Sequence, residues 1–524
     1  MTTSAEKSVP TEVNPPAAAP SAGDKSPDRE AASLPQGSGF FSKIKLPYVM
    51  GIGVLVIIVL LLVGYMKFSG SGGVEQRKRI DVGNTNPGQV KTINMQGHWK
   101  GEDLRENFVT ETVKEFETRN PNLKVNIKWN ADFPGGRQGA LRATIDELKS
   151  GKIDWDIIWL EPFYYQEIAD GLKDQNWAKN YLVDFETVPG FKESQKPFIL
   201  SDPQFRNHMN GVITGPYMEG FYQPFFYNKD LTDKMGIKVK DKNMTFEDLL
   251  GYFKAVYDYN QKNGTNIPIL YDSGDYTGGI GYAPSTWNLF QSLFRSEFSN
   301  LADVQDTKPS TAKLAVVRKV LGSLEQLSKY KPLIPGWEGL DWFGTRYYVL
   351  EDKAVFTVCG ASWMYSHWHG IDARKTMKMV PVEMPMYQPV THYMGGYNPM
   401  FAVVKNSPVR DEAVQLMMAF STPNIAEKWV RYAKGPSGIK GNVSQAGSTS
   451  QDTTQFDTFI TYITDKYGGN VFDSKTVDYV LGAKYKDLTL EFDKHLGAVM
   501  DGKITASQAY NLIVTDMQKV DNAK

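Results

Sequence analysis

The sequence predicts an α/β protein built from two lobes, and two observations lead to this fold class. The chain has 524 residues, which is too long for a single ordinary hydrophobic core. From about residue 92 onward, short apolar runs alternate with stretches whose apolar residues recur at helical spacing. An order of strand, helix and strand predicts a parallel sheet whose crossovers are right-handed.

The first elements of this pattern can be placed individually. TINMQGHW predicts a strand, and the helix that follows ends before Pro121. LKVNIKWN alternates as a strand, RQGALRATIDELKSG predicts a helix closed by Gly151, and DWDIIWL predicts a buried strand. In GFYQPFFYNKDL, Phe225 to Tyr227 predict a central strand, because central strands favour aromatic residues. Further helices are expected at 245–262, 311–330 and 408–420.

Composition excludes some classes of function. The formal net charge is -1, so the chain lacks the basic excess that nucleic-acid binding needs, and no nucleic-acid partner is expected. Cys359 is the only cysteine, which excludes an internal disulfide and a Cys-based zinc site. Its setting in AVFTVCG predicts a small buried side chain.

The N-terminal part differs in composition from the rest. Residues 1–45 are rich in Pro, Ala and Ser, and a disordered tail is expected there. Residues 46–66, LPYVMGIGVLVIIVLLLVGYM, predict a transmembrane helix in contact with the lipid bilayer. The run starts late and no cysteine follows it, so we expect an uncleaved anchor rather than a signal peptide. Residues 67–91 predict a flexible tether.

Several segments, in order, resemble a known family. They are FVTETVKEFETRNPNLKV, LRATIDELKSGKIDWDIIWLEP, GFYQPFFYNKDLTDKMGIKVKDKNMTFEDLLGYFKAV, LEDKAVFTVCGASWM and YNPMFAVVKNSPVRDEAVQLMMAFSTPNIAEKWV. Residues 92–520 thereby resemble the extracellular solute-binding proteins of ATP-binding-cassette importers, the family 1 group that includes maltose-binding protein. Trp155 stands where that family usually has Pro, and a transmembrane anchor is a second departure.

The resemblance implies the type II periplasmic-binding-protein fold, the Venus flytrap, with the solute in a cleft between two lobes. Lobe 1 would comprise residues 92–222 and 397–436, and lobe 2 residues 223–396 and 437–524. The chain would cross between them near 220–224, 395–400 and 435–440. Gly and Pro clusters at these places, in GPYMEG, YMGGYNP and AKGPSGIKG, suit hinges.

The candidate ligand-binding residues follow from this fold. Ligands of open parallel sheets bind at the carboxyl ends of the strands. Trp363 also matches the position of a cleft Trp in the family's "GxW" turn. The complete set of candidates is His98, Trp99, Trp159, Glu161, Phe163, Tyr217, Glu219, Asp272, Tyr276 and Trp363.

These residue types suit a carbohydrate, because pyranose rings stack on Trp or Tyr while hydroxyl groups bond to carboxylates and guanidinium groups. The expected function is that of a membrane-anchored receptor on the extracytoplasmic side, which passes an oligosaccharide or polyol to the permease subunits. The alternatives are a polysaccharide-acting enzyme, with Glu161, Asp272 and Asp275 as candidate carboxylates, and a ligand sensor or surface scaffold. No cofactor is expected. No metal is expected either, because His367 and His369 in SHWHG would point apart on a helix and could not chelate together.

Overall fold

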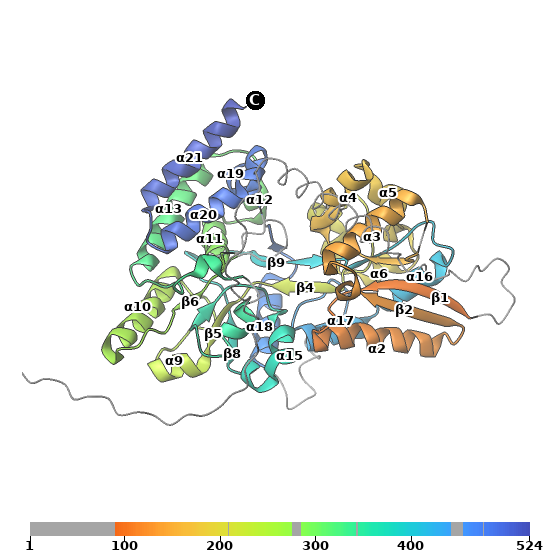
Figure 1. Ribbon diagram of the computed structural model, residues 1–524, viewed down its shortest axis with the longest axis horizontal. Helices are drawn as coiled ribbons and strands as arrows, with labels where there is room; N and C mark the ends of the chain where they lie inside the picture. Colours follow the sequence, from red (N-terminus) through yellow and green to blue (C-terminus); the bar gives the residue numbers. More distant parts are fainter. Residues whose placement is uncertain are drawn as a thin grey trace, which may run out of the picture. The chain divides into compact units, whose positions relative to one another are not determined.

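Three sheets organise the chain in the computed structural model, which describes residues 90–152, 154–207, 209–274, 284–341, 344–441, 454–474 and 476–523. Two of the sheets have four strands each, and a three-stranded sheet lies between them (Figure 1). The predicted tail and anchor, and all but the last two residues of the predicted tether, lie outside the described residues.

The first four-stranded sheet has the order β10-β3-β1-β2. Strand β1 is parallel to β2 and β3, as the alternating sequence pattern predicts, and β10 pairs with β3 in the antiparallel direction. Gly97 ends β1 beside Trp129, where a Cβ atom would meet the indole at 2.6 Å. The strands are β1 (Lys91–Gly97), β2 (Leu123–Trp129), β3 (Ile157–Trp159) and β10 (Phe401–Val403).

The second four-stranded sheet has the order β6-β7-β5-β8. The predicted strand at Phe225 is confirmed as β5, which lies inside this sheet between β7 and β8. Phe225 and Phe226 are fully buried, so this aromatic run belongs to the core around this sheet. We call the part of the protein built on this sheet the second lobe, and the part built on the first four-stranded sheet the first lobe. The strands are β5 (Phe225–Asn228), β6 (Leu270–Tyr271), β7 (Phe356–Thr357) and β8 (Met379–Val382).

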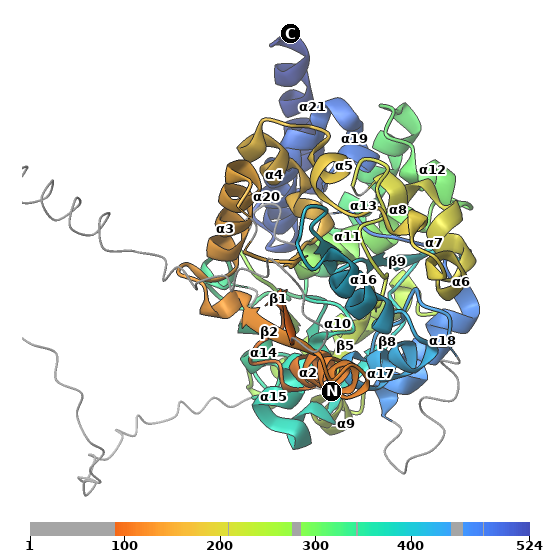
Figure 2. The ribbon, with the colours of Figure 1, turned by 90° about the vertical axis from the view of Figure 1, so that its right-hand side faces the viewer.

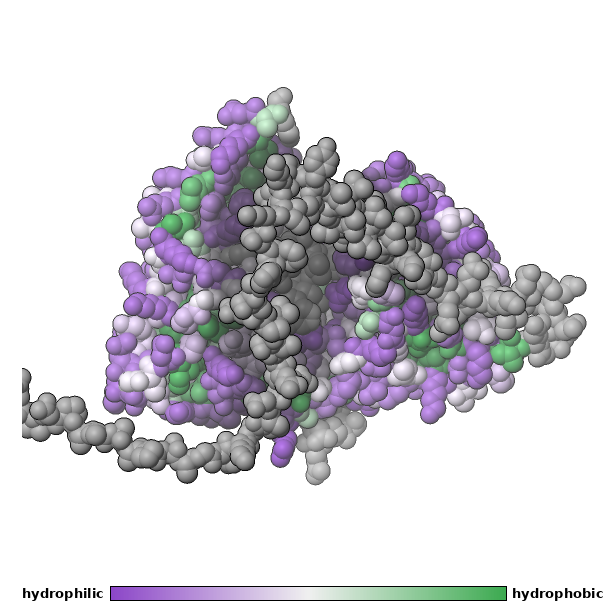
Figure 3. Space-filling model, in the orientation of Figure 1, coloured by the Kyte–Doolittle hydropathy of each residue, from purple (hydrophilic) through white to green (hydrophobic). Residues whose placement is uncertain are grey.

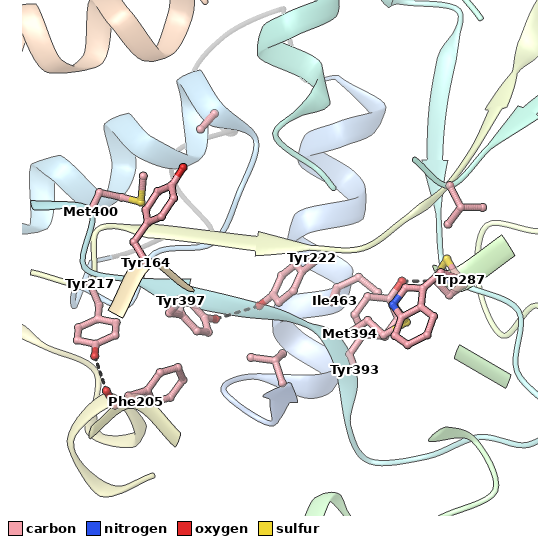
Figure 4. Close-up of a cluster of buried hydrophobic side chains, with 14 of the residues drawn as sticks. Tyr164, Phe205, Tyr217, Tyr222, Trp287, Tyr393, Met394, Tyr397, Met400 and Ile463 are labelled. Atoms are coloured by element: carbon pink, nitrogen blue, oxygen red, sulfur yellow. Dashed lines mark hydrogen bonds between the residues drawn. The ribbon is translucent and has the colours of Figure 1, made fainter. Parts of the chain in front are cut away.

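The connecting sheet, with the order β11-β9-β4, joins the two lobes. Strands β4 (Glu219–Tyr222) and β9 (Tyr393–Asn398) pair in the antiparallel direction, and β11 (Val471–Phe472) runs parallel to β9. Buried tyrosines line this sheet, and the hydroxyl groups of Tyr222 and Tyr397 are 3.3 Å apart (Figure 4). Gly220 allows the close packing here, because a Cβ atom on it would lie 2.3 Å from the carbonyl oxygen of Pro436.

Helices surround the sheets (Figure 2). The predicted helices at 245–262, 311–330 and 408–420 are confirmed as α10, α13 and α16. Between β1 and β4 the helices are α2 (Asp103–Arg119), α3 (Gly136–Ser150), α4 (Tyr165–Leu172), α5 (Trp177–Tyr181), α6 (Phe191–Ser194), α7 (Pro197–Ser201) and α8 (Pro203–Asn207).

The remaining helices follow β5. Up to β9 they are α9 (Lys229–Met235), α10 (Phe246–Asn263), α11 (Ser285–Arg295), α12 (Leu301–Gln305), α13 (Thr311–Ser328), α14 (Thr345–Tyr348) and α15 (Met364–Thr376). After β10 they are α16 (Arg410–Ala419), α17 (Pro423–Ala433), α18 (Gln455–Tyr467), α19 (Asp478–Leu481), α20 (Thr489–Met500) and α21 (Ala506–Asn522).

Local sequence signals explain several helix ends. Thr245 and Asp248 form a capping box at the start of α10, and Gly264 ends that helix in the left-handed region. Cys359 is buried as predicted, and its thiol lies 3.3 Å from the hydroxyl group of Ser285. The face shown in Figure 3 is largely hydrophilic where it is coloured, which agrees with a core that gathers the apolar side chains inside.

Candidate functional site

The turn after β1 begins the candidate site. Trp99 has a φ of 72°, which is unusual for a bulky residue, and its carbonyl oxygen accepts a 3.0 Å hydrogen bond from the amide of Glu102. The indole is buried against Phe401 and Trp429, and this packing holds the backbone in place. The turn leads directly into α2, and the guanidinium group of Arg105 in that helix lies beside the indole of Trp99.

Arg105 connects the two lobes. Its guanidinium group donates to Glu102 and lies 3.2 Å from Nε2 of His367, which is on α15 of the second lobe. The same group lies 5.4 Å from the ring centre of Trp99 and 5.4 Å from that of Trp363. Helix α15 packs against α2, so this contact is part of a larger interface between the lobes (Figures 1 and 2).

Glu219 joins the group from the connecting sheet. Its Oε1 atom lies 3.7 Å from Nη1 of Arg105, and its side chain is buried at the start of β4. Residues of the first lobe, the second lobe and the connecting sheet therefore meet at a single guanidinium group.

A second group of side chains forms around His98. The imidazole stacks on Trp159 at the end of β3, with 4.8 Å between ring centres and 20° between planes. Its Nε2 atom lies 3.7 Å from Oε1 of Glu161 and 3.5 Å from Nη2 of Arg137. Arg137 is in the first turn of α3, and its guanidinium carbon lies 5.5 Å from the ring centre of Trp159.

The two groups form one electrostatic unit. Burial, together with the charges of Arg137 and Arg105, holds the pKa of His98 well below its usual range. Burial and the charges of Arg346 and Arg105 do the same to the pKa of His367, so both rings are neutral at pH 7. Nε2 of His367 is also 3.2 Å from Nη2 of Arg346 on α14.

The carboxyl groups respond to the same burial. Burial raises the pKa of Glu219 to about 8, although the charge of Arg105 opposes this rise. Burial also raises the pKa of Glu161, against the charges of Arg137 and Arg105. We call the whole set the interlobe cluster; it comprises His98, Trp99, Glu102, Arg105, Arg137, Trp159, Glu161, Glu219, Arg346, Trp363 and His367.

Of the ten candidates from the sequence, six lie in the interlobe cluster: His98, Trp99, Trp159, Glu161, Glu219 and Trp363. Tyr217 lies in the core of the first lobe, where its hydroxyl group donates to the carbonyl oxygen of Phe205 at 2.8 Å (Figure 4). Phe163 is in the short 3-10 helix Pro162–Tyr164 after Glu161, and its side chain is outside the described part of the structure. Tyr276 also lies outside the described residues.

Asp272 has a structural role at the start of α11. Its carboxylate accepts hydrogen bonds from the amides of Ser285 and Thr286, at 2.6 and 3.1 Å, and from the hydroxyl group of Thr286. Burial still raises its pKa to about 6. These bonds occupy both carboxylate oxygens and account for its position without a catalytic role.

Five members of the cluster were not among the sequence candidates: Glu102, Arg105, Arg137, Arg346 and His367. Four of them, Glu102, Arg105, Arg137 and His367, lie in or beside the first turn of a helix that follows a strand or a strand–loop segment. A search restricted to the residue just after each strand therefore misses them. Extending it into the following helical turn would have included Arg105.

His367 and His369 contact different partners, as their positions on a helix predict. His367 faces Arg105 and Glu102, whereas Nδ1 of His369 lies 3.0 Å from a carboxylate oxygen of Asp103. Within the described ranges, no group of three or more His, Cys, Asp or Glu residues is arranged to hold a metal ion.

The fold and the interlobe cluster define a two-lobed α/β binding protein. A family model described as "Bacterial extracellular solute-binding protein" matches residues 111–456, which is more than half of the chain. The chain therefore belongs to the bacterial extracellular solute-binding protein family, and this family implies a location outside the cytoplasm. Comparison with curated proteins gives no match.

Solved structures of bacterial proteins share this fold. The GacH receptor of Streptomyces glaucescens, solved unliganded and with acarbose, is 14% identical with a TM-score of 0.56, over 82% of this chain and 98% of that one. RafE of Streptococcus pneumoniae is 14% identical with a TM-score of 0.55, over 82% and 97%. The binding protein msme of Bacillus subtilis, in an open conformation, is 13% identical with a TM-score of 0.54, over 84% and 99%.

These likenesses establish the two-lobed periplasmic-binding-protein fold. The anchor that the sequence predicts at residues 46–66 lies outside the described residues. In the part of the chain that the structure describes, no helix combines the length and apolar character needed to span a bilayer.

Proposed function

We propose that this chain is the solute receptor of an ATP-binding-cassette importer and that it binds a carbohydrate between its lobes. The observation that carries the proposal is the interlobe cluster, in which Trp99, Trp159 and Trp363 accompany buried guanidinium, carboxyl and imidazole groups. Aromatic faces suit the C–H surfaces of a sugar ring, and the polar groups suit its hydroxyls. A structural neighbour in complex with acarbose and another that is a chitin oligosaccharide binding protein support the same choice.

Binding would act on the balance between open and closed arrangements of the lobes. Arg105 of the first lobe and Trp363 of the second lie at the same contact. A solute that touches both lobes binds the closed arrangement more tightly than the open one, and it shifts the population by that difference. The closed receptor would then present its solute to the permease subunits.

The remaining parts of the proposal concern the ends and borders of the domains. Residues 46–66 would anchor the receptor in the bilayer and residues 67–91 would tether it, with the large domain on the extracytoplasmic side. We infer lobes close to the predicted borders, 92–222 with 397–436 and 223–396 with 437–524. Ile439 pairs in a β-bridge with Gln195 of the first lobe. This pairing favours a third crossing that comes slightly after the inferred border at residue 436.

Thermal unfolding of the full chain tests this function with a panel of mono- and oligosaccharides, polyols and amino acids. A ligand that binds only the folded state, at a hundredfold excess over its Kd, adds about 2.7 kcal/mol of stability. We expect a saccharide to raise the midpoint and Trp363→Ala to abolish the rise. A rise with an amino acid alone, or with no solute of the panel, contradicts the proposal.

A further inference from the structure

Asp493 is a buried carboxyl group that does not belong to the interlobe cluster. It lies on the buried face of α20, and the residue is 7% exposed. In the described part of the chain, no hydrogen bond or ion pair reaches this carboxyl group, and Asp272 is the one charged group that acts on it. A buried carboxylate without a partner is costly, so Asp493 marks a place where another molecule can supply a donor or a cation.

Helix α11 brings Asp493 and Asp272 into the same part of the second lobe. Asp272 accepts hydrogen bonds from the first two amides of α11, at 2.6 and 3.1 Å. Helix α20 packs against α11 (Figure 1), and Phe492, the neighbour of Asp493 in the chain, meets Trp287 of α11 edge-on with 5.8 Å between ring centres. Both carboxyl groups therefore lie near the start of α11, but only Asp272 has its oxygens occupied.

Trp287 adds a second unsatisfied polar group beside α20. Its indole Nε1–H finds no acceptor within the described structure, although the residue is only 2% exposed. The contact between Trp287 and Phe492 also places aromatic surface beside Asp493. Aromatic rings attract cations through their faces, so a carboxyl group and aromatic rings together suit an organic cation.

This part of the second lobe lies at the sheet edge where ligands are expected. Strands β6 and β7 are parallel, and Asp272 directly follows β6. Cys359 comes shortly after β7, and its thiol lies 3.3 Å from the hydroxyl group of Ser285 at the start of α11. Trp363 of the interlobe cluster follows Cys359 in the chain. Since ligands bind at the carboxyl ends of such strands, Asp493 and the interlobe cluster serve the same edge of the second lobe.

We propose that the solute is a saccharide with a free amino group, whose ammonium binds the carboxylate of Asp493 while a sugar ring contacts the indoles of the interlobe cluster. This inference rests on the proposed function and names the class of sugar. An ammonium group donates hydrogen bonds to a carboxylate and also offsets its buried negative charge. A hydroxyl group or an N-acetyl amide donates a hydrogen bond but leaves that charge uncompensated.

Proton release gives a readout of this pairing that does not depend on a variant. Burial, and after it the charge of Asp272, raise the pKa of Asp493 well above its usual range, so the carboxyl group is protonated in the free receptor. It loses this proton when an ammonium group binds. Calorimetry at about pH 6, where amines are protonated, in buffers with different enthalpies of ionisation counts the protons released. We expect about one proton per amino saccharide bound and none per N-acetylated saccharide.

Calorimetric titration of the full chain also tests the preference itself. The probes are oligomers of glucosamine and of galactosamine, each beside its N-acetylated form. We expect at least one amine to bind roughly tenfold or more tightly than its N-acetylated form. Asp493→Asn keeps the shape of the side chain and should remove most of this preference. Asp258→Asn is the matched control, because Asp258 is an exposed residue of α10 that pairs with Lys254, and it should leave the preference unchanged.

The outcomes separate this inference from the proposed function. Equal binding of amine and N-acetylated form, a preference that survives Asp493→Asn, or the absence of proton release from wild type overturns the amino-saccharide inference. Each of these results leaves the proposed function standing if a saccharide binds. Binding of no saccharide at all overturns the proposed function itself.

Discussion

At the scale of single residues, Arg105 concentrates the interactions between the lobes. It contacts Glu102, Glu219 and His367 and lies beside two indoles. Its side chain is almost fully buried, so its charge depends on these partners rather than on water. The residue therefore links the stability of the fold to the chemistry of the site.

Replacing Arg105 should be strongly destabilising. Arg105→Gln leaves the largely buried carboxyl group of Glu102 without its cation, and breaking a buried pair in this way costs about 3–5 kcal/mol. Urea denaturation of the full chain measures the free energy of unfolding. Arg119→Gln, which removes an exposed pair on the same helix, should cost less than about 1 kcal/mol. Equal losses for the two variants would contradict the role assigned to Arg105.

Glu219 should make stability depend on pH. Its pKa rises from 4.5 to about 8 on folding, so the folded protein binds a proton more tightly than the unfolded chain. The stability that Glu219 contributes is therefore fully present below pH 4.5 and is lost as the pH rises through about 8. Denaturation of wild type and Glu219→Gln at several pH values measures this. The difference in the free energy of unfolding between wild type and Glu219→Gln should change between pH 4.5 and about 8. A difference that stays constant over this range would refute the assignment.

The residue scale also shows what sequence reasoning could reach. Trp99, Trp159 and Trp363 were found because each follows a strand or a recognisable turn. Arg105 and Arg346 lie within helices, where an arginine ordinarily faces solvent, and residue type alone does not distinguish them from Arg119. Their role comes from contacts with residues more than twenty positions away or in the other lobe, such as His367.

At the scale of elements, the connecting sheet is where three segments of the chain meet. Gly220 in β4 lies beside Tyr397 of β9 and Pro436, and Gly435 approaches the carbonyl oxygen of Gly220. The Gly and Pro clusters in the sequence pointed to these positions. The sequence did not predict the strand pairing, in which β4 and β9 are antiparallel and share a sheet with β11.

A methyl group at Gly220 should disturb this meeting point. Its Cβ atom would lie 2.3 Å from the carbonyl oxygen of Pro436, so backbone must shift, and overpacking of this kind costs about 1–3 kcal/mol. Gly322→Ala is the matched control: Gly322 lies within α13 and has open space around a Cβ atom. That control should be stabilising by up to about 1 kcal/mol. Thermal unfolding of both variants gives the comparison, and a neutral Gly220→Ala would contradict the packing argument.

At the scale of the whole molecule, the two-lobed fold could be predicted from the order of family-like segments along the chain. The convergence of side chains between the lobes could not, because it depends on how α2 and α15 pack against each other. Periodicity along one helix does not determine its contacts with a distant helix. The fold and the six converging candidates were thus accessible from sequence, and the arginine partners required the structure.

The central claim is that one solute engages both lobes through the interlobe cluster. The most direct test is calorimetric titration of the saccharide that binds wild type into Arg137→Met and Trp363→Ala, one from each lobe. Arg119→Gln and the exposed Tyr347→Ala serve as controls in the same two lobes. The account predicts that both cluster variants weaken binding at least tenfold while the controls do not. Loss confined to one lobe, or unchanged binding in both cluster variants, would contradict it.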